Sequence, residues 1–223
     1  MNAKQAAAYK AVEAVQPGMT VGLGTGTTAY FAIEKLGEMI RGGLQVQAVG
    51  SSVATEELAK KAGIQIVDFA ALSSIDLYID GADEVDARFN LIKGGGGALV
   101  REKIVAFNSK TFVVIVDSSK RVQTLGKFPL PVEVVPFAVN LTMQHLEKLG
   151  GQAVLRRRED KTFISDNGNV IVDVHFNTIS DPVALNAAIN TIPGVVESGL
   201  FNGAMVSHLI VGHEDGRVEV VAR

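Results

Sequence analysis

The sequence predicts an α/β protein: a Rossmann-like parallel sheet with helices on both faces, plus a smaller ferredoxin-like α+β domain. In the first half, short apolar runs alternate with helical segments, which is typical of a parallel sheet. Three prolines then fall within residues 126–138, a composition typical of a domain boundary. The later elements have the order βαββαβ of a ferredoxin-like unit. We therefore expect one domain over residues 1–127, with residues 202–223 returning to it, and a small domain over residues 128–201.

Local composition predicts the elements of the first domain. An alanine-rich stretch without a breaker predicts a helix over residues 3–15, which Pro17 and Gly18 follow. The hydroxyls of Ser51 and Ser52 are suited to cap a later helix. The other expected helices cover residues 28–41, 53–62 and 98–108, and the expected strands cover residues 20–23, 44–49, 64–67, 75–80 and 111–116.

The small domain is predicted in the same way. Asp166, Asn167 and Gly168 form a turn signal between two apolar runs. Residues 208–221 are strand-like, and we expect them to return to the first domain. The predicted strands cover residues 132–135, 152–155, 170–174 and 195–201, and the predicted helices cover residues 138–149 and 182–190.

Composition excludes several classes of protein. The 223 residues are 47% hydrophobic and 20% charged, as in globular proteins. The net charge of −3 favours neither a nucleic-acid nor a membrane partner, and the lack of cysteine excludes disulfides and thiolate chemistry. Every apolar run is interrupted, and the first ten residues lack the apolar core of a secretory signal, so we expect a cytoplasmic protein.

The first candidate site is GLGTGTTA, residues 22–29, between a predicted strand and helix. A dinucleotide fingerprint would need glycine at position 27, where the chain has Thr27, and the Walker pattern is also absent. A tight turn with the hydroxyls of Thr25, Thr27 and Thr28 at a helix N-terminus suits a phosphate. The alternative is an N-capped helix after a tight turn.

The second candidate is DGADEVD, residues 80–86, where a predicted strand ends. Its carboxylates cannot all be deeply buried as anions. They are suited to bind magnesium, or Asp80 and Asp83 are suited to hold sugar hydroxyls; a solvated acidic turn is the third possibility. Gly81 and Ala82 keep the loop small, so that a ligand can approach its backbone.

The third candidate is KGGGGALVREKI, residues 93–104. Four consecutive glycines are costly in backbone entropy, and at the start of a helix their N–H groups are suited to form an anion-binding nest. Lys93 adds positive charge, and Glu102 lies early in the helix, from which it can project back toward the loop. A flexible linker is the alternative.

The remaining signals are weaker. Lys120, after another predicted strand, and Lys4, in the first helix, are each either phosphate contacts or surface charges. Residues 51–59 are expected only to cap a helix. The four histidines lack metal-ligand spacing, and the basic run 156–158, followed by two acidic residues, indicates a solvated hairpin.

These candidates together suit one reaction, the movement of a proton between adjacent carbons of a phosphorylated sugar. A carboxylate removes the proton beside a carbonyl, and Lys93 with loop N–H groups stabilises the resulting enediolate oxygen. A bound phosphate aligns the reacting end of the substrate.

The motifs at residues 22–29, 51–59, 80–86, 93–104, 117–120 and 126–136, in this order, closely resemble those of the A-type ribose-5-phosphate isomerases. The resemblance spans nearly the whole chain. It departs at Thr27, where serine is common, and the segment after Gly203 is less recognisable.

The resemblance implies interconversion of ribose 5-phosphate and ribulose 5-phosphate, in the non-oxidative pentose phosphate pathway, through an enediol and without metal or cofactor. It implies that Glu102 is the general base, with Asp80, Asp83 and Lys93 also catalytic, and that the protein is a homodimer or homotetramer. The implied substrate-binding residues are Thr25, Gly26, Thr27, Thr28, Asp80, Gly81, Ala82, Asp83, Lys93, Gly94, Gly95, Gly96, Lys120 and Lys4.

Three alternatives to this function remain. An aminosugar-phosphate deaminase of related fold would release ammonia from its substrate. A sugar-phosphate sensor would bind without turnover and leave Glu102 without a task. A nicotinamide dehydrogenase is disfavoured by Thr27.

Overall fold

A computed structural model describes all 223 residues of the chain, which divides into two compact units. Unit 1 consists of Met1–Ala82, Arg101–Arg121 and Ala204–Arg223, and unit 2 consists of Asp83–Val100 and Val122–Gly203. The division into domains at residues 127 and 128 stays a prediction. None of the helices is both long enough and apolar enough to cross a membrane.

Unit 1 contains a six-stranded sheet of order β15-β14-β6-β3-β1-β2. All neighbouring strands are parallel except β14 and β15, which form an antiparallel hairpin at one edge. The predicted parallel sheet is thus confirmed. Its strands are β1 (Thr20–Leu23), β2 (Gln47–Gly50), β3 (Ile75–Asp80), β6 (Ser109–Asp117), β14 (His208–Gly212) and β15 (Val218–Ala222).

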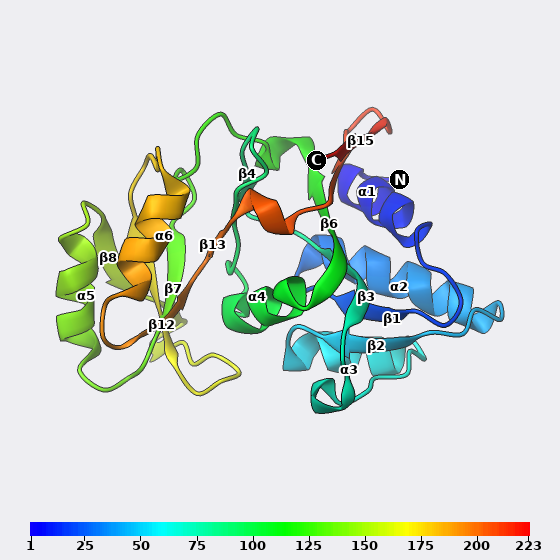
Figure 1. Ribbon diagram of the computed structural model, residues 1–223, viewed down its shortest axis with the longest axis horizontal. Helices are drawn as coiled ribbons and strands as arrows, with labels where there is room; N and C mark the ends of the chain where they lie inside the picture. The colour runs from blue at the N-terminus through cyan, green and yellow to red at the C-terminus, as the bar shows by residue number, and fades with distance from the viewer. The chain divides into compact units, whose positions relative to one another are not determined.

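Helices cover both faces of this sheet (Figure 1). The residues of β1 face these two sides alternately. Val21 and Leu23 belong to an apolar core shared with residues of α1 and α2. Gly22 points to the opposite face, where a Cβ would lie 2.7 Å from Val105 of α4, so this helix packs directly on the strand. The helices are α1 (Ala3–Val12), α2 (Thr27–Arg41), α3 (Val53–Lys61) and α4 (Leu99–Phe107).

Unit 2 contains an antiparallel sheet of order β12-β7-β11-β8, with α5 and α6 sharing one apolar core with it. Numbered along the chain, this order is 4-1-3-2, which confirms the ferredoxin-like prediction. The elements are β7 (Leu130–Val134), α5 (Val139–Glu147), β8 (Gln152–Leu155), β11 (Val170–His175), α6 (Pro182–Asn190) and β12 (Val195–Ser198).

Two smaller sheets complete unit 2. A three-stranded antiparallel sheet has the order β13-β5-β4, and β9 pairs with β10 in a hairpin. Their strands are β4 (Glu84–Val85), β5 (Leu91–Ile92), β9 (Arg157–Arg158), β10 (Lys161–Thr162) and β13 (Leu200–Phe201).

Several predicted elements differ from the structure in their bounds, and three of these differences have a physical reason in the contacts. Residues 64–67 do not form a strand of the sheet. They lie beside the edge strand β2, where Ile66 makes only an isolated bridge to Ala48. The predicted strand over residues 195–201 is divided at Gly199 between two sheets, because the Gly199 N–H donates to Pro131 of β7 at 2.7 Å and its carbonyl accepts from the Lys93 N–H, just after β5, at 2.9 Å. The first helix ends at Val12 rather than residue 15 because its last turn tightens to i→i−3 bonds.

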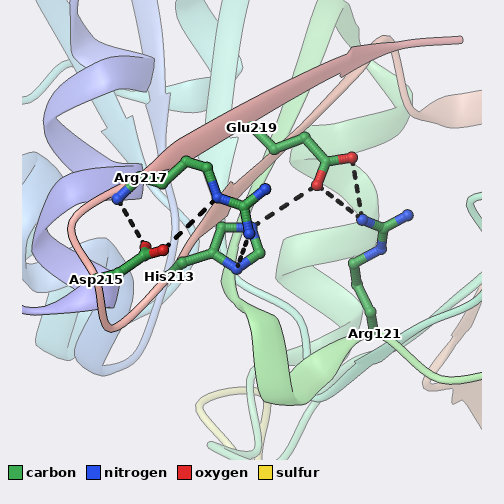
Figure 2. A network of polar contacts seen from close by, with 5 residues as sticks. All are labelled: Arg121, His213, Asp215, Arg217 and Glu219. Atoms are coloured by element: carbon green, nitrogen blue, oxygen red, sulfur yellow. Dashed lines mark hydrogen bonds and ion pairs between the residues drawn. The ribbon is translucent and has the colours of Figure 1, made fainter.

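A polar network ties the C-terminal hairpin to the segment after β6 (Figure 2). Arg121 donates to both carboxylate oxygens of Glu219, at 3.1 and 3.0 Å. His213 lies 3.7 Å from the same carboxylate and 3.4 Å from Arg217. Arg121 directly follows the 3₁₀ turn Ser118–Lys120, so this network lies next to Lys120 in the chain.

Candidate active site

The loops with the strongest sequence signals in unit 1 follow adjacent parallel strands. Gly24–Thr28 follows β1, Ser51–Ser52 follows β2, Asp80 ends β3, and Ser118–Lys120 follows β6. These strands are neighbours in the sheet, so their carboxyl ends share one edge. This edge is where open α/β sheets bind their ligands.

The start of α2 is open to an anion. Its N-cap is Gly26, with a φ of 105°, and no side chain caps the helix. The N–H groups of the first turn therefore point outward without a capping oxygen, which suits a phosphate. Gly24 is required just before, because a Cβ there would lie 2.0 Å from Asp80 Oδ1.

Lys4 lies at this helix N-terminus. Its Nζ donates to Thr27 Oγ1 at 3.1 Å, although 23 residues separate the two in sequence. The contact brings a cation from α1 to the open end of α2, where it adds positive potential for an anion. Thr27 itself is exposed.

A cluster of hydroxyl groups forms hydrogen bonds to the loop Gly24–Thr28. Thr25 Oγ1 lies 2.9 Å from the hydroxyls of Ser51 and Ser52 and 3.0 Å from that of Thr55. Thr55 in turn donates to the Gly24 carbonyl at 2.9 Å. The expectation that residues 51–59 only cap a helix is therefore wrong: Ser52 does cap α3, but the segment also fixes the loop Gly24–Thr28. The sequence signal for this role was that Ser51 and Ser52 follow a predicted strand of the same sheet.

Asp80 is fully buried and is held by hydrogen bonds. Its Oδ1 accepts from the backbone N–H groups of Thr25 and Gly81, at 3.1 and 2.7 Å. Its Oδ2 accepts from the Tyr78 hydroxyl. These donors offset the cost of burying the charge and fix the carboxylate against the loop Gly24–Thr28.

Tyr78 was not predicted as part of the site. Burial raises the pKa of its hydroxyl well above the usual value, and the charges of Asp80 and Glu102 raise it further. Tyr78 therefore stays neutral and acts as a donor. The signal in the sequence is its spacing, because residues two apart in a strand share one face.

Glu102 is buried, with 3% of its surface exposed, in the first turn of α4. Its charge acts on the Tyr78 hydroxyl, so in unit 1 it belongs to the same electrostatic environment as Asp80. A buried carboxylate at the start of a helix is suited to exchange a proton with a ligand.

Unit 2 carries the other predicted site residues. Lys93 follows β5, is 2% exposed, and its Nζ lies 5.6 Å from the centre of the Phe201 ring. Asp83 accepts a hydrogen bond from Gly95 N at 2.8 Å, so a carboxylate and the glycine loop are directly joined. Of this loop, Gly95 and Gly96 are exposed.

The acidic segment is not one cluster. Glu84 is buried and accepts from the backbone N–H groups of Gly126 and Phe128, at 2.7 and 2.6 Å. Asp86 accepts from the backbone N–H groups of Arg88 and Asn90 and holds a turn. No group of three or more potential metal-ligating side chains occurs in the structure. These two carboxylates have structural tasks.

The prediction of a solvated hairpin is wrong for Arg156. Arg157 and Arg158 are exposed, but the Arg156 side chain is only 13% exposed and binds the glycine loop. The sequence did not distinguish Arg156 from its two neighbours, because an arginine that binds a loop and an arginine in solvent have the same local sequence pattern.

Two features define the class of this protein. The start of α2 is open to a phosphate, and buried carboxylates are suited to proton exchange, so the chain is of the class of α/β enzymes that act on small phosphorylated molecules. Residues 47–216 match the model of the family ribose 5-phosphate isomerase A (phosphoriboisomerase A). The chain belongs to this family.

Relatives and solved structures agree with this assignment. The chain is 52% identical to ribose-5-phosphate isomerase A of Sphingopyxis alaskensis, over 89% of the chain and 87% of the relative. It is 50% identical to that of Thermoplasma acidophilum, over 96% and 89%. The structure of ribose 5-phosphate isomerase A from Methanocaldococcus jannaschii matches with a TM-score of 0.93 and 43% identity, covering 99% of this chain and 98% of that one. A D-ribose-5-phosphate isomerase in complex with phospho-erythronic acid matches with a TM-score of 0.95 and 39% identity, covering all of both chains.

Proposed function

We propose that the protein interconverts D-ribose 5-phosphate and D-ribulose 5-phosphate by proton transfer, as a step of the non-oxidative pentose phosphate pathway. The observation that carries this proposal is the family match over residues 47–216, which contain the acidic segment, the glycine loop and Glu102. A sugar-phosphate sensor and an aminosugar-phosphate deaminase are not favoured, since the relatives named above are isomerases.

In the proposed mechanism Glu102 is the base. Its carboxylate removes the proton from C2 of the open-chain aldose, the C1=C2 bond forms, and the carbonyl electron pair moves onto O1. Lys93 and glycine-loop N–H groups stabilise this oxygen. After a proton moves from O2 to O1, Glu102 returns its proton to C1 and the ketose forms. Neither a metal nor a cofactor enters these steps.

The other residues are proposed to bind and orient substrate. The segment Thr25–Thr28 holds the phosphate through the open N–H groups at the start of α2, assisted by the cations of Lys4 and Lys120. The segment Asp80–Asp83, including the backbone of Gly81 and Ala82, and the loop Lys93–Gly96 hold the sugar. The open end of α2 and the Lys4–Thr27 contact support the phosphate assignment.

We further propose that the protein is cytoplasmic and works as a homodimer or homotetramer. The family's metabolic role supports the location. Exposed apolar side chains such as Phe137, which is 87% exposed, support self-association.

Purified protein incubated with ribose 5-phosphate in EDTA, in ordinary and deuterated water, tests the function. We expect rapid formation of ribulose 5-phosphate in both solvents, with deuterium entering beside the carbonyl to the extent that the abstracted proton exchanges. Ribose 5-phosphate that binds without turnover would support the sensor instead. Ammonia release from glucosamine 6-phosphate would support the deaminase, and activity abolished by EDTA would contradict the metal-independent mechanism.

A further inference from the structure

Arg156 binds the backbone of the glycine loop. It lies between β8 and β9 of unit 2, and its Nη1 donates to the carbonyl oxygens of Gly94 and Gly95, at 2.9 and 3.1 Å. Both carbonyls belong to the loop that the proposed function assigns to the substrate. Arg156 itself is absent from the predicted site residues.

Asp173 on β11 locks this arginine. Arg156 Nε donates to Asp173 Oδ2 at 2.9 Å, and Nη2 donates to Oδ1 at 2.5 Å. The side chains are 13% and 21% exposed, so the pair is largely shielded from water. A two-point contact fixes the plane of the guanidinium, which leaves Nη1 aimed at the loop.

The consequence for the loop follows from peptide geometry. The Gly94 carbonyl accepts from Arg156, while the N–H of the same peptide, on Gly95, donates to Asp83 Oδ2 at 2.8 Å. The chain has no cis peptide bond, so C=O and N–H of each peptide point in opposite directions. Because the Gly95 carbonyl also points to Arg156, the Gly96 N–H points away from the arginine.

Close packing and a turn hydrogen bond, from the Gly97 N–H to the Gly94 carbonyl at 2.9 Å, act together with Arg156 to hold this arrangement of the loop. A Cβ on Gly95 would lie 2.7 Å from Asp83 Oδ1, and a Cβ on Gly97 would lie 2.4 Å from the Phe163 ring. The Phe163 ring in turn lies 5.9 Å from the Arg156 guanidinium carbon. The loop thus has Asp83 on one side and Arg156 with Phe163 on the other, while Gly95 and Gly96 remain exposed.

We propose that Arg156, held by Asp173, is a positioning residue for the isomerisation: it turns the Gly94 and Gly95 carbonyls away from substrate, so that the loop N–H groups face Asp83 and the developing oxyanion. The inference rests on the proposed function. It assigns a task to the one arginine of the run 156–158 that is not exposed.

The test compares Arg156→Ala, Arg156→Lys and Asp173→Asn with Arg157→Ala, a neighbouring exposed arginine whose loss changes the net charge equally. For each variant, kcat and KM for ribose 5-phosphate, the inhibition constant of phospho-erythronic acid and the melting temperature are measured. We expect Arg156→Ala to lower kcat about 10- to 100-fold, with a much smaller change in KM, because misplaced donors weaken transition-state stabilisation.

The conservative variants separate positioning from a structural role. Lysine supplies a donor but not the fork that binds Asp173 and the loop together, so Arg156→Lys should restore part of kcat, and Asp173→Asn should lower kcat less than Arg156→Ala. Arg157→Ala should match the wild type. If Arg156→Ala does not fold, the other two variants decide.

Two results would overturn the inference while the wild type isomerises ribose 5-phosphate. One is a kcat of the Arg156 variants equal to that of Arg157→Ala. The other is a loss that disappears when activity is expressed per folded molecule, with only the melting temperature lowered. An inactive wild type would instead reject the proposed function itself.

Discussion

Unit 1 buries three ionisable side chains in the site, Asp80, Tyr78 and Glu102, and their burial is explained in different ways. Asp80 is fully buried yet accepts hydrogen bonds from two backbone N–H groups and from Tyr78, which together stabilise its charge. Tyr78 remains neutral because ionisation would place a further charge beside Asp80 and Glu102. Asp80 and Tyr78 thus stabilise the loop Gly24–Thr28, in addition to the contact with the sugar that we propose for Asp80, whereas Glu102 is the group we propose for proton transfer.

Glu102→Gln should retain ribose 5-phosphate binding and lose most turnover. The amide has the same shape but cannot accept the proton from carbon, and loss of a general base costs about 10²–10⁴ in kcat. Steady-state kinetics and calorimetric binding of phospho-erythronic acid measure the two effects. Glu57→Gln, an exposed glutamate of α3, is the control with the same charge change. Turnover near the wild-type value would remove Glu102 from the role of base.

Tyr78→Phe should lower the free energy of unfolding by about 1–3 kcal/mol at neutral pH, because Asp80 Oδ2 loses a buried donor. The stacking of ring 78 on Phe112, with centres 4.8 Å apart, is retained. The effect should depend on pH. The pKa of Tyr78 is raised in the folded state, so its contribution is complete below the unfolded pKa of about 10 and is lost as pH rises above it.

Urea unfolding of wild type and Tyr78→Phe between about pH 7 and pH 11 measures this difference. The two stability curves should converge in the alkaline range, where unfolded Tyr78 is already ionised. Curves that stay parallel up to the highest pH would contradict the raised pKa.

At the scale of elements, the helices start in two ways, with or without a side-chain cap, and α5 as well as α2 starts without one. Asn2 caps α1, Ser52 caps α3 and Asp181 caps α6, each with a side-chain oxygen that accepts a backbone N–H. No side chain caps α2, whose N-cap is the exposed Gly26, in the loop that we propose for the phosphate. An uncapped start is a cost to stability that a bound anion offsets.

Lys4→Met should raise KM for ribose 5-phosphate about two- to fivefold at low salt, with little change in kcat, because one cation near the open end of α2 is lost. The increase should shrink as salt screens the charge. Lys10→Met is the matched control, since Lys10 lies on the same helix but pairs with Glu13. An equal KM for both variants at every ionic strength would separate Lys4 from the phosphate site.

Local pattern was sufficient for most elements and insufficient where contacts are distant in sequence. The segment 182–190 has the proline start and asparagine end of a helix, and α6 coincides with it. The bridge at Ile66 depends on an edge of the sheet, which no local window reveals. In the site, motif spacing identified the loops. Tyr78 is recognised only because it lies on the same face of β3 as Asp80, and Arg156 only because it contacts Gly94, 62 residues away in sequence.

At the scale of the whole molecule, the two main motifs both cross from one unit to the other. The acidic segment 80–86 leaves unit 1 after Ala82, and the segment 93–104 returns to it at Arg101. Each motif therefore contributes residues to both units, with Asp80 and Glu102 in unit 1 and Asp83 and Lys93 in unit 2. The residues of each motif therefore pack in different units. Spacing along the chain identified them together, although they do not belong to one hydrophobic core.

The proposed homo-oligomer is the property that belongs to the whole molecule alone. Phe137 and Leu141, at the start of α5, are 87% and 52% exposed, and their burial against a second copy would remove apolar surface from water. Light scattering after size exclusion should give two or four times the chain mass of 23.6 kDa. The double variant Phe137→Ser, Leu141→Ser should shift the mass downward, whereas Val183→Ser, a 53% exposed residue of α6, should not. A wild-type mass of one chain would reject the oligomer, and an unchanged mass of the double variant would place the contact elsewhere on the surface.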